Sequence, residues 1–353
     1  MIRVDGLCKT FKAPKRFPGL RGAVKGLFSR EYTYTTAVDD VSFRIAEGEV
    51  VGYIGANGAG KSTTIKMMTG ILTPSAGRVT VAGVVPYENR MLNASRIGVV
   101  FGQRTQLWWD LPVSESLSLL RDIYEVKPAD YQERLAFLNG VLELDEFMMS
   151  PVRTLSLGQR MRADLAASLI HRPKVLYLDE PTIGLDAIVK ERVRGAVKEL
   201  NRSYGTTIVL TTHDLADIEE LCRHIIVIDR GRKVYDGTLP ELRAAYGRGR
   251  TIRAHIAGFA SFDPAALDAA LKALDPGASA RKEADELVAR FDASATGIAK
   301  VVQALMAACE IADYTVEETP IEDIVKRIYA EARRDVVAGD SVAGDPAAAA
   351  GRI

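Results

Sequence analysis

The sequence has few cysteines, no long apolar run and no excess of either charge. Its three cysteines, Cys8, Cys222 and Cys309, are odd in number and far apart, which argues against a disulfide framework or a cysteine metal site. No apolar run approaches the ~20 residues of a membrane-spanning helix, and the first residues lack the pattern of a signal peptide. These absences predict a protein of a reducing compartment, the cytoplasm.

The overall composition is that of a globular protein. Lysine plus arginine and aspartate plus glutamate both number 46, so net charge gives no reason to expect nucleic-acid binding. The 353 residues are 47% hydrophobic and 26% charged, and they are enough for two or three domains.

One glycine-rich stretch carries the clearest chemistry. Residues 55–63, Gly-Ala-Asn-Gly-Ala-Gly-Lys-Ser-Thr, fit the pattern G-x-x-x-x-G-K-[ST] of a phosphate-binding loop. The apolar run 50–54 before it predicts a buried strand, and the helical spacing of Ile65, Met68 and Leu72 after it predicts a helix. A strand, a glycine turn and a helix in this order allow backbone N–H groups to surround phosphate oxygens.

The residue types in this loop suit a nucleotide with its metal ion. Lys61 is expected to reach the β- and γ-phosphates, and Ser62 to offer its hydroxyl to Mg²⁺. The predicted nucleotide-binding residues of the loop are Gly55, Asn57, Gly58, Ala59, Gly60, Lys61, Ser62 and Thr63.

A second apolar run, residues 175–178, ends in Asp179 and Glu180. A strand end at this place would hold Asp179 near the Mg²⁺ shell, and Glu180 would polarise the attacking water. Such a run alone is common and usually structural, but after a phosphate-binding loop it indicates the second half of an ATP site.

With these motifs in this order, residues 1 to about 246 resemble the nucleotide-binding subunit of an ATP-binding cassette (ABC) transporter. Residues 155–159 match that family's LSGGQ signature, and residues 179–182 match its second nucleotide motif. The other matched positions are Asp186 in the loop that crosses the dimer, His213 as the switch histidine and Gln103 as the Q-loop glutamine.

The resemblance implies an α/β fold, the P-loop NTPase cassette, with a RecA-like core, an antiparallel β subdomain and a helical subdomain at about 104–172. It implies ATP hydrolysis with Glu180, His213 and Gln103 as catalytic residues, and Mg²⁺ held by Ser62, Gln103 and Asp179. Two copies of the chain would enclose two ATP molecules head to tail. Ser156, Gly158, Gln159 and Asp186 would then reach the partner's nucleotide.

The family also implies separate integral membrane permease subunits and a place at the cytoplasmic face of the inner membrane. The signature Leu-Ser-Leu-Gly-Gln and the run Trp-Trp-Asp-Leu-Pro at 108–112 resemble exporters of drugs and viologens, which predicts a drug-like or hydrophobic, cationic substrate. The alternative class is a non-transport ABC ATPase acting on nucleic acid or the ribosome. Those proteins carry two cassettes or a long coiled coil, and this chain has neither.

Several assignments stay open at this point. Tyr32 is the preferred ring to stack on adenine, with Phe11 and Tyr34 as rivals. Gln106 is an alternative to Gln103, because the spacing here has one extra residue. Leu157 replaces a signature glycine.

Two further segments have two interpretations each. Trp108 and Trp109 either contact the permease, since tryptophan is favoured at interfaces, or pack inside the helical subdomain. The basic insertion 9–31 has seven basic residues before Glu31 and an apolar stripe at Leu20, Ala23, Val24, Leu27 and Phe28. It is either an amphipathic helix against the permease or an anionic lipid surface, or a solvated loop.

The C-terminal part is expected to form a separate domain. Alternating strand and helix patterns predict a small α+β accessory domain at 247–331, with strengthening of the dimer as its expected role. Residues 332–353 are rich in alanine, glycine and aspartate, which predicts a disordered tail.

Overall fold

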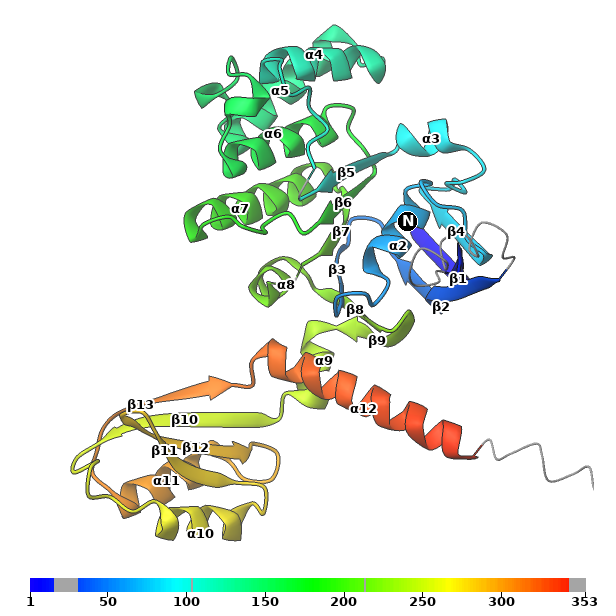
Figure 1. Cartoon of the computed structure of the whole chain (residues 1–353). Coiled ribbons are helices and arrows are strands. Elements are labelled where there is room, and N and C mark those ends of the chain that lie inside the picture. Colours follow the sequence, from blue (N-terminus) through cyan, green and yellow to red (C-terminus); the bar gives the residue numbers. More distant parts are fainter. Residues whose placement is uncertain (16–30, 103, 213, 343–353) are drawn as a thin grey trace, which may run out of the picture. The chain divides into compact units, whose positions relative to one another are not determined.

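The computed structural model describes residues 1–15, 31–102, 104–212 and 214–342 (Figure 1). The chain divides into two compact units, Met1–Thr238 and Leu239–Ile353. Each unit has its own hydrophobic core. Among the described residues, no helix combines the length and the apolar character needed to cross a membrane.

A six-stranded sheet with the order β5-β6-β7-β3-β8-β9 forms the centre of the first unit (Figure 1). Its strands β5 to β8 and β3 are parallel, and β9 runs antiparallel to β8. The parallel strands are almost wholly buried, which explains their continuous apolar runs. The strands are β3 (Val50–Gly55), β5 (Ile97–Phe101), β6 (Val175–Asp179), β7 (Thr207–Thr211), β8 (His224–Asp229) and β9 (Arg232–Thr238).

An antiparallel sheet of three strands, in the order β2-β1-β4, completes the core of this unit. Its strands are β1 (Ile2–Pro14), β2 (Tyr32–Ile45) and β4 (Ala76–Val81). The short helices α2 (Lys61–Met68) and α3 (Arg90–Ala94) follow β3 and β4. Apolar side chains of both sheets and of α2 share one core, for example Phe43, Tyr53 and Ile65.

Strand β1 extends into the segment 9–31 that the sequence predicted to be an insertion. Pairing with β2 continues to Pro14, opposite Tyr32. The first residues of the expected insertion 9–31 are therefore strand, because β2 offers them a hydrogen-bonded partner. The apolar stripe of the predicted amphipathic helix falls within 16–30, outside the described residues.

The predicted helical region lies between β5 and β6. It contains α4 (Val113–Ile123), α5 (Pro128–Leu142), η1 (Leu144–Glu146), η2 (Val152–Thr154) and α6 (Leu157–Leu169). Helices α4 and α5 pack on α6, which is buried over most of its length. Two more helices, α7 (Ala187–Tyr204) and α8 (Leu215–Leu221), follow β6 and β7 and pack on each other.

The second unit is an α+β domain in which a four-stranded antiparallel sheet has the order β11-β12-β10-β13. Helices α10 and α11 share a core with one face of this sheet (Figure 1), in a β-α-β-β-α-β arrangement. Its elements are α9 (Leu239–Tyr246), β10 (Gly249–Ile256), α10 (Ala265–Leu274), β11 (Ser279–Glu283), β12 (Glu286–Asp292), α11 (Ile298–Ala308), β13 (Ile311–Glu318) and α12 (Ile321–Val342).

Both ends of this unit differ from the sequence-based boundaries. Helix α9 belongs to the second unit, before the expected boundary at 246, because it packs on α12 and buries Leu242. Helix α12 continues to Val342, through part of the segment 332–353 that was predicted to be disordered. Extending an existing helix costs far less than nucleating one, and composition alone does not capture this. Residues 343–353 lie outside the described part.

Candidate nucleotide-binding site

The phosphate-binding loop is the turn between β3 and α2, at the carboxyl end of the parallel strands, where ligands bind in such sheets. Gly60 is the N-cap of α2 with φ of 105°, a conformation that favours glycine. A Cβ atom at Gly60 would lie 2.4 Å from the carbonyl oxygen of Ala37. Ala59 accepts a backbone hydrogen bond of 2.9 Å from Gly231, so the β8–β9 hairpin supports the loop.

Lys61 is the first residue of α2 and is only 7% exposed. Its Nζ donates to the carbonyl oxygens of Gly55 at 2.7 Å and Ala56 at 3.2 Å. Burial lowers the pKa of Lys61, and the negative charges of Glu180 and Asp179 oppose this effect. The ammonium group therefore lies close to both carboxylates of the second motif.

Asp179 ends β6 and faces both the loop helix and β7. Its Oδ1 accepts a hydrogen bond of 2.5 Å from the Thr211 hydroxyl, and its Oδ2 one of 3.5 Å from the Ser62 hydroxyl. A carboxylate beside a hydroxyl suits Mg²⁺, which binds one or two carboxylates and takes its other oxygens from phosphates and water. In the described part of the chain, no three His, Cys, Asp or Glu residues form a protein-only metal site.

Glu180 has a left-handed backbone, with φ of 56°, which costs about 1–3 kcal/mol in a residue other than glycine. Its N–H donates to the Thr211 carbonyl oxygen at 2.9 Å. On its other side, a Cβ atom at Gly102 would lie 2.2 Å from the Glu180 carbonyl oxygen. The ends of β5, β6 and β7 therefore hold the Glu180 backbone from both sides.

A cavity of about 680 Å³ lies at this edge of the sheet and is lined by residues of the loop, of α2 and of the second motif. The lining residues are Phe11, Ser62, Thr63, Lys66, Ile71, Leu72, Phe101, Gly102, Arg104, Asp179 and Glu180. Sequence reasoning did not single out Arg104, since an arginine in a loop carries no local signal.

Only one of the three candidate aromatic rings, Phe11, is among the described residues that line this cavity. Tyr32 lies further along the hairpin, opposite Pro14, and the Nζ of Lys12 lies 3.8 Å from the centre of its ring. Tyr34 is 64% exposed, with Lys12 6.0 Å from its ring.

The signature motif forms the N-terminus of α6. Ser156 is the N-cap: its hydroxyl accepts from the Gln159 N–H at 3.2 Å, and the Gln159 Oε1 accepts from the Ser156 N–H at 3.0 Å. Gly158 packs on α7, where a Cβ atom would lie 2.8 Å from Val189. Leu157, in place of the family glycine, is 36% exposed.

The signature and the phosphate-binding loop line different cavities. Leu157 lines a different cavity, of about 170 Å³, with Arg160, Asp164 and Ile183 among its neighbours. Asp186 caps α7, accepting from the Val189 N–H at 3.0 Å. Ser156 and Asp186 are both exposed, so both motifs are accessible to another molecule.

Two of the predicted catalytic residues, Gln103 and His213, lie outside the described residues. The rival glutamine, Gln106, is bonded to helix α6: its Nε2 donates to the Asp164 carbonyl oxygen at 3.0 Å, and its N–H donates to Asp164 Oδ1 at 3.0 Å. This places the Gln106 side chain on α6 rather than at Asp179.

Neither tryptophan is enclosed by the helical region, which favours the alternative of a contact surface. Trp108 is 39% exposed and Trp109 is 49% exposed. The guanidinium of Arg160 lies 5.5 Å from the centre of the Trp109 ring. The indole rings therefore offer apolar surface to a partner.

The comparisons with known proteins agree with this geometry. A family model described as "ABC transporter" matches residues 38–183. The linearmycin resistance ATP-binding protein LnrL of Bacillus subtilis (strain 168) is 31% identical over 278 residues, which are 79% of this chain and 87% of that protein. The daunorubicin resistance ATP-binding protein DrrA3 of Streptomyces coeruleorubidus is 37% identical over 221 residues, 63% of this chain and 69% of its own.

Relatives named for import also match. The methionine import ATP-binding protein MetN of Haemophilus influenzae (strain 86-028NP) is 34% identical over 248 residues, covering 69% of this chain and 67% of MetN. Among solved structures, the dimeric ATP-binding cassette MJ0796, in a post-hydrolysis state bound to ADP and Pi, has a TM-score of 0.56 and 25% identity. The aligned region covers 68% of this chain and 99% of the MJ0796 chain.

Proposed function

This chain belongs to the ABC transporter family of ATP-binding proteins, and it is an ATPase subunit of such a transporter; from this premise we propose that it drives export through separate permease subunits. One observation gives the main support for the ATPase activity. Four residues lie together at the carboxyl edge of one parallel sheet, namely Lys61, Ser62, Asp179 and Glu180. The resistance proteins among its relatives support export of a drug-like or hydrophobic substrate.

We propose the following roles at the nucleotide. The residues of the loop, Gly55, Asn57, Gly58, Ala59, Gly60, Lys61, Ser62 and Thr63, surround the phosphates with N–H groups and one ammonium group. Ser62, Asp179 and Gln103 would hold Mg²⁺, which neutralises phosphate charge when bound. The hard oxygen donors of Ser62 and Asp179, which already lie within 3.5 Å of each other, support this part of the proposal.

Glu180 is proposed as the general base or water-orienting residue, with His213 and Gln103 as the other catalytic residues. Its backbone is held between the ends of β5 and β7, and this supports a fixed position for its carboxylate. For the ring that stacks on adenine, we propose Phe11 rather than Tyr32. Phe11 lines the same cavity as Ser62 and Thr63, and Tyr32 is not among the residues that line it.

The second nucleotide face is proposed to come from a second copy of this chain. Ser156, Gly158, Gln159 and Asp186 are the residues that would reach the partner's ATP, with the N-terminus of α6 directed at the γ-phosphate. Dimeric cassettes among the similar structures support self-association. Ser156 uses its hydroxyl oxygen as an acceptor in the cap, so the hydroxyl proton remains available for a phosphate oxygen.

The membrane-facing surface is proposed to include Trp108 and Trp109, which would contact the permease at the cytoplasmic face of the membrane.

The basic insertion 9–31 is also proposed to contact lipid or the permease. This proposal rests on Arg16, Arg21, Lys25 and Arg30, since the described Lys9, Lys12 and Lys15 each have a partner within the unit. Flotation of the parent and of the Arg21→Glu and Lys25→Glu variants with anionic and neutral vesicles tests the lipid version, and equal, negligible binding in every case would remove it.

Transport by membrane vesicles tests the proposed function. Inside-out vesicles containing the chain and its permease are expected to accumulate a drug-like substrate only with ATP. Accumulation by right-side-out vesicles instead would show import, in agreement with the MetN relatives rather than with the resistance proteins.

The Trp108→Ala/Trp109→Ala double variant should lose permease binding in detergent while retaining ATP binding and thermal stability. Loss of stability would show that the rings serve the fold.

A further inference from the structure

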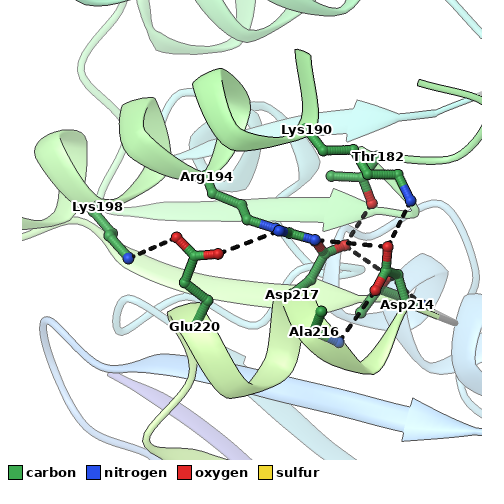
Figure 2. Close-up of polar contacts among 9 residues, drawn as sticks. Thr182, Lys190, Arg194, Lys198, Asp214, Ala216, Asp217 and Glu220 are labelled. Atoms are coloured by element: carbon green, nitrogen blue, oxygen red, sulfur yellow. Dashed lines mark hydrogen bonds and ion pairs between the residues drawn. The ribbon is translucent and has the colours of Figure 1, made fainter. Parts of the chain in front are cut away.

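A buried carboxylate lies behind the catalytic edge, on the first turn of α8. Asp217 is 0% exposed and accepts three side-chain hydrogen bonds. Its Oδ2 accepts from the Thr182 hydroxyl at 2.5 Å and from the Thr212 hydroxyl at 3.0 Å, and its Oδ1 accepts from Arg194 Nε at 2.6 Å (Figure 2). One carboxylate thus joins the chain after β6, helix α7 and the chain after β7.

Two of these segments carry the proposed chemistry. Thr182 comes two residues after Glu180, and Thr212 follows Thr211, whose hydroxyl bonds to Asp179. The Thr212 hydroxyl oxygen also accepts from the Asp214 N–H at 2.9 Å. The chain after β6 and the chain after β7 are therefore attached to the same oxygen of Asp217.

The charged groups around Asp217 form a connected network of ion pairs (Figure 2). Arg194, with 14% of its side chain exposed, also lies 3.2 Å from Glu220 and 3.6 Å from Asp214. Lys190 pairs with Asp214 at 2.6 Å, and Lys198 pairs with Glu220 at 2.8 Å. The buried Asp217 is thus neutralised by Arg194 and has its oxygens satisfied, as a buried charge requires.

The left-handed backbone of Glu180 needs such support. A residue other than glycine keeps this conformation only where several surrounding contacts hold it in place. The backbone N–H of Glu180 is bonded to Thr211, and Thr182 follows two residues later in the chain. We propose that Asp217 is a positioning residue that locks the Glu180–Thr182 turn to Thr212 at the end of β7 through the two threonine hydroxyls, and so orients Glu180 toward the water that attacks ATP. This inference rests on the proposed ATPase mechanism.

Paired threonine variants test the proposal in the full-length chain. Thr182→Val keeps the shape of the side chain and removes its hydroxyl, whereas Thr182→Ser keeps the hydroxyl. We expect Thr182→Val to lower kcat by about 10- to 100-fold, as a small misplacement of a reacting group does. The KM for ATP should stay within about twofold of the parent value, and Thr182→Ser should restore most of kcat.

Thr212→Val and Thr212→Ser form a second pair, which keeps the proposal testable if Thr182→Val does not fold. Because both hydroxyls act through one oxygen, the double valine variant should lose less than the product of the two single losses in kcat. Lys198→Ala is the matched control, since it removes an outer ion pair of the same network without touching either threonine; its kcat should equal that of the parent.

Several outcomes would overturn the proposal. These are a valine variant with kcat close to the parent's, a serine variant as slow as the valine variant, or a loss of kcat accompanied by an equal loss of ATP affinity and thermal stability. A parent protein without ATPase activity would instead contradict the proposed function itself, so the two failures are distinguishable.

Discussion

The two units of the chain use their sheets in opposite ways. In the first unit, parallel strands end at one edge, and residues from distant parts of the sequence meet there: Lys61, Asp179, Glu180 and Thr211. In the second unit, antiparallel strands end alternately at both edges, and their charged residues pair across the sheet. Arg253 bonds to Glu286 and Glu317, and Arg290 bonds to Glu283.

The difference lies in what surrounds each charge. At the catalytic edge, Lys61 is buried and interacts with the charges of two carboxylates, and its neighbours Ser62 and Thr63 line a cavity. On the second sheet, the charges are partly exposed and neutralise one another, and pairs of this kind contribute little to stability because solvent screens them. We therefore expect substitutions in the first unit to change catalysis, and comparable substitutions in the second unit to change little.

The largest effect on ATP turnover is expected for Glu180→Gln. Removing a general base typically costs 10²–10⁴ in rate, so ATP turnover should nearly disappear. The amide keeps the size of the side chain, so ATP binding should persist and an ATP-bound dimer should accumulate. ATPase assays and size-exclusion chromatography with ATP measure both effects. Glu191→Gln, an exposed carboxylate on α7, is the control, and turnover within a few-fold of the parent in Glu180→Gln would refute the assignment.

The next effect is expected for Lys61→Ala, which should weaken ATP binding by about 10- to 100-fold because a charge-assisted contact to phosphate is lost. Equilibrium binding of a fluorescent ATP analogue measures it. Lys233→Ala, which removes a pair with Asp236 on β9, should leave binding unchanged. Equal affinities in both variants would mean that Lys61 serves only the structure of the loop.

Asp164 gives a pH-dependent test within the first unit. Burial raises the pKa of Asp164 to about 6, although hydrogen bonds from Gln106 and Thr105 favour its charged form. The folded state thus holds a proton that the unfolded state releases near pH 4. As pH rises from about 4 to about 6, the contribution of this group to the free energy of unfolding falls, by up to about 3 kcal/mol.

The Asp164→Asn variant isolates the contribution of Asp164 to the pH dependence of stability, because an amide does not titrate. The parent should lose stability relative to the variant between pH 4 and pH 7, as measured by urea unfolding. The partly buried His171, whose pKa desolvation lowers to about 4, acts with the opposite sign, but it is present in both proteins and cancels in the difference. A difference that stays constant over this range would contradict the shift.

The smallest effect is expected for Arg253→Gln in the second unit. It removes the pairs with Glu286 and Glu317, and the free energy of unfolding should change little because solvent screens these partly exposed groups. kcat should stay at the parent value. A tenfold loss of ATPase activity would break the contrast between the units and give the second sheet a part in catalysis.

Much of the site was predictable because its motifs are local. The loop 55–63, the strand ending at Asp179 and the cap at Ser156 are each specified by a few neighbouring residues. Helix α7 likewise has local signals at both ends, since Asp186 caps one end and Gly205 ends the other. Strand β11 and helices α3, α8 and α9 were not identified, because short elements carry little periodicity.

What the sequence determined by itself is the chemistry: a phosphate-binding loop, its acidic partners and a signature, in one order. Only the tertiary structure decided which groups share a site. The β1–β2 register places Phe11 opposite Thr35 and carries Tyr32 to the far end of the hairpin, and hydrogen bonds across three segments bring Thr182, Thr212 and Arg194 to Asp217. Register and burial depend on contacts between distant residues, so no local pattern encodes them.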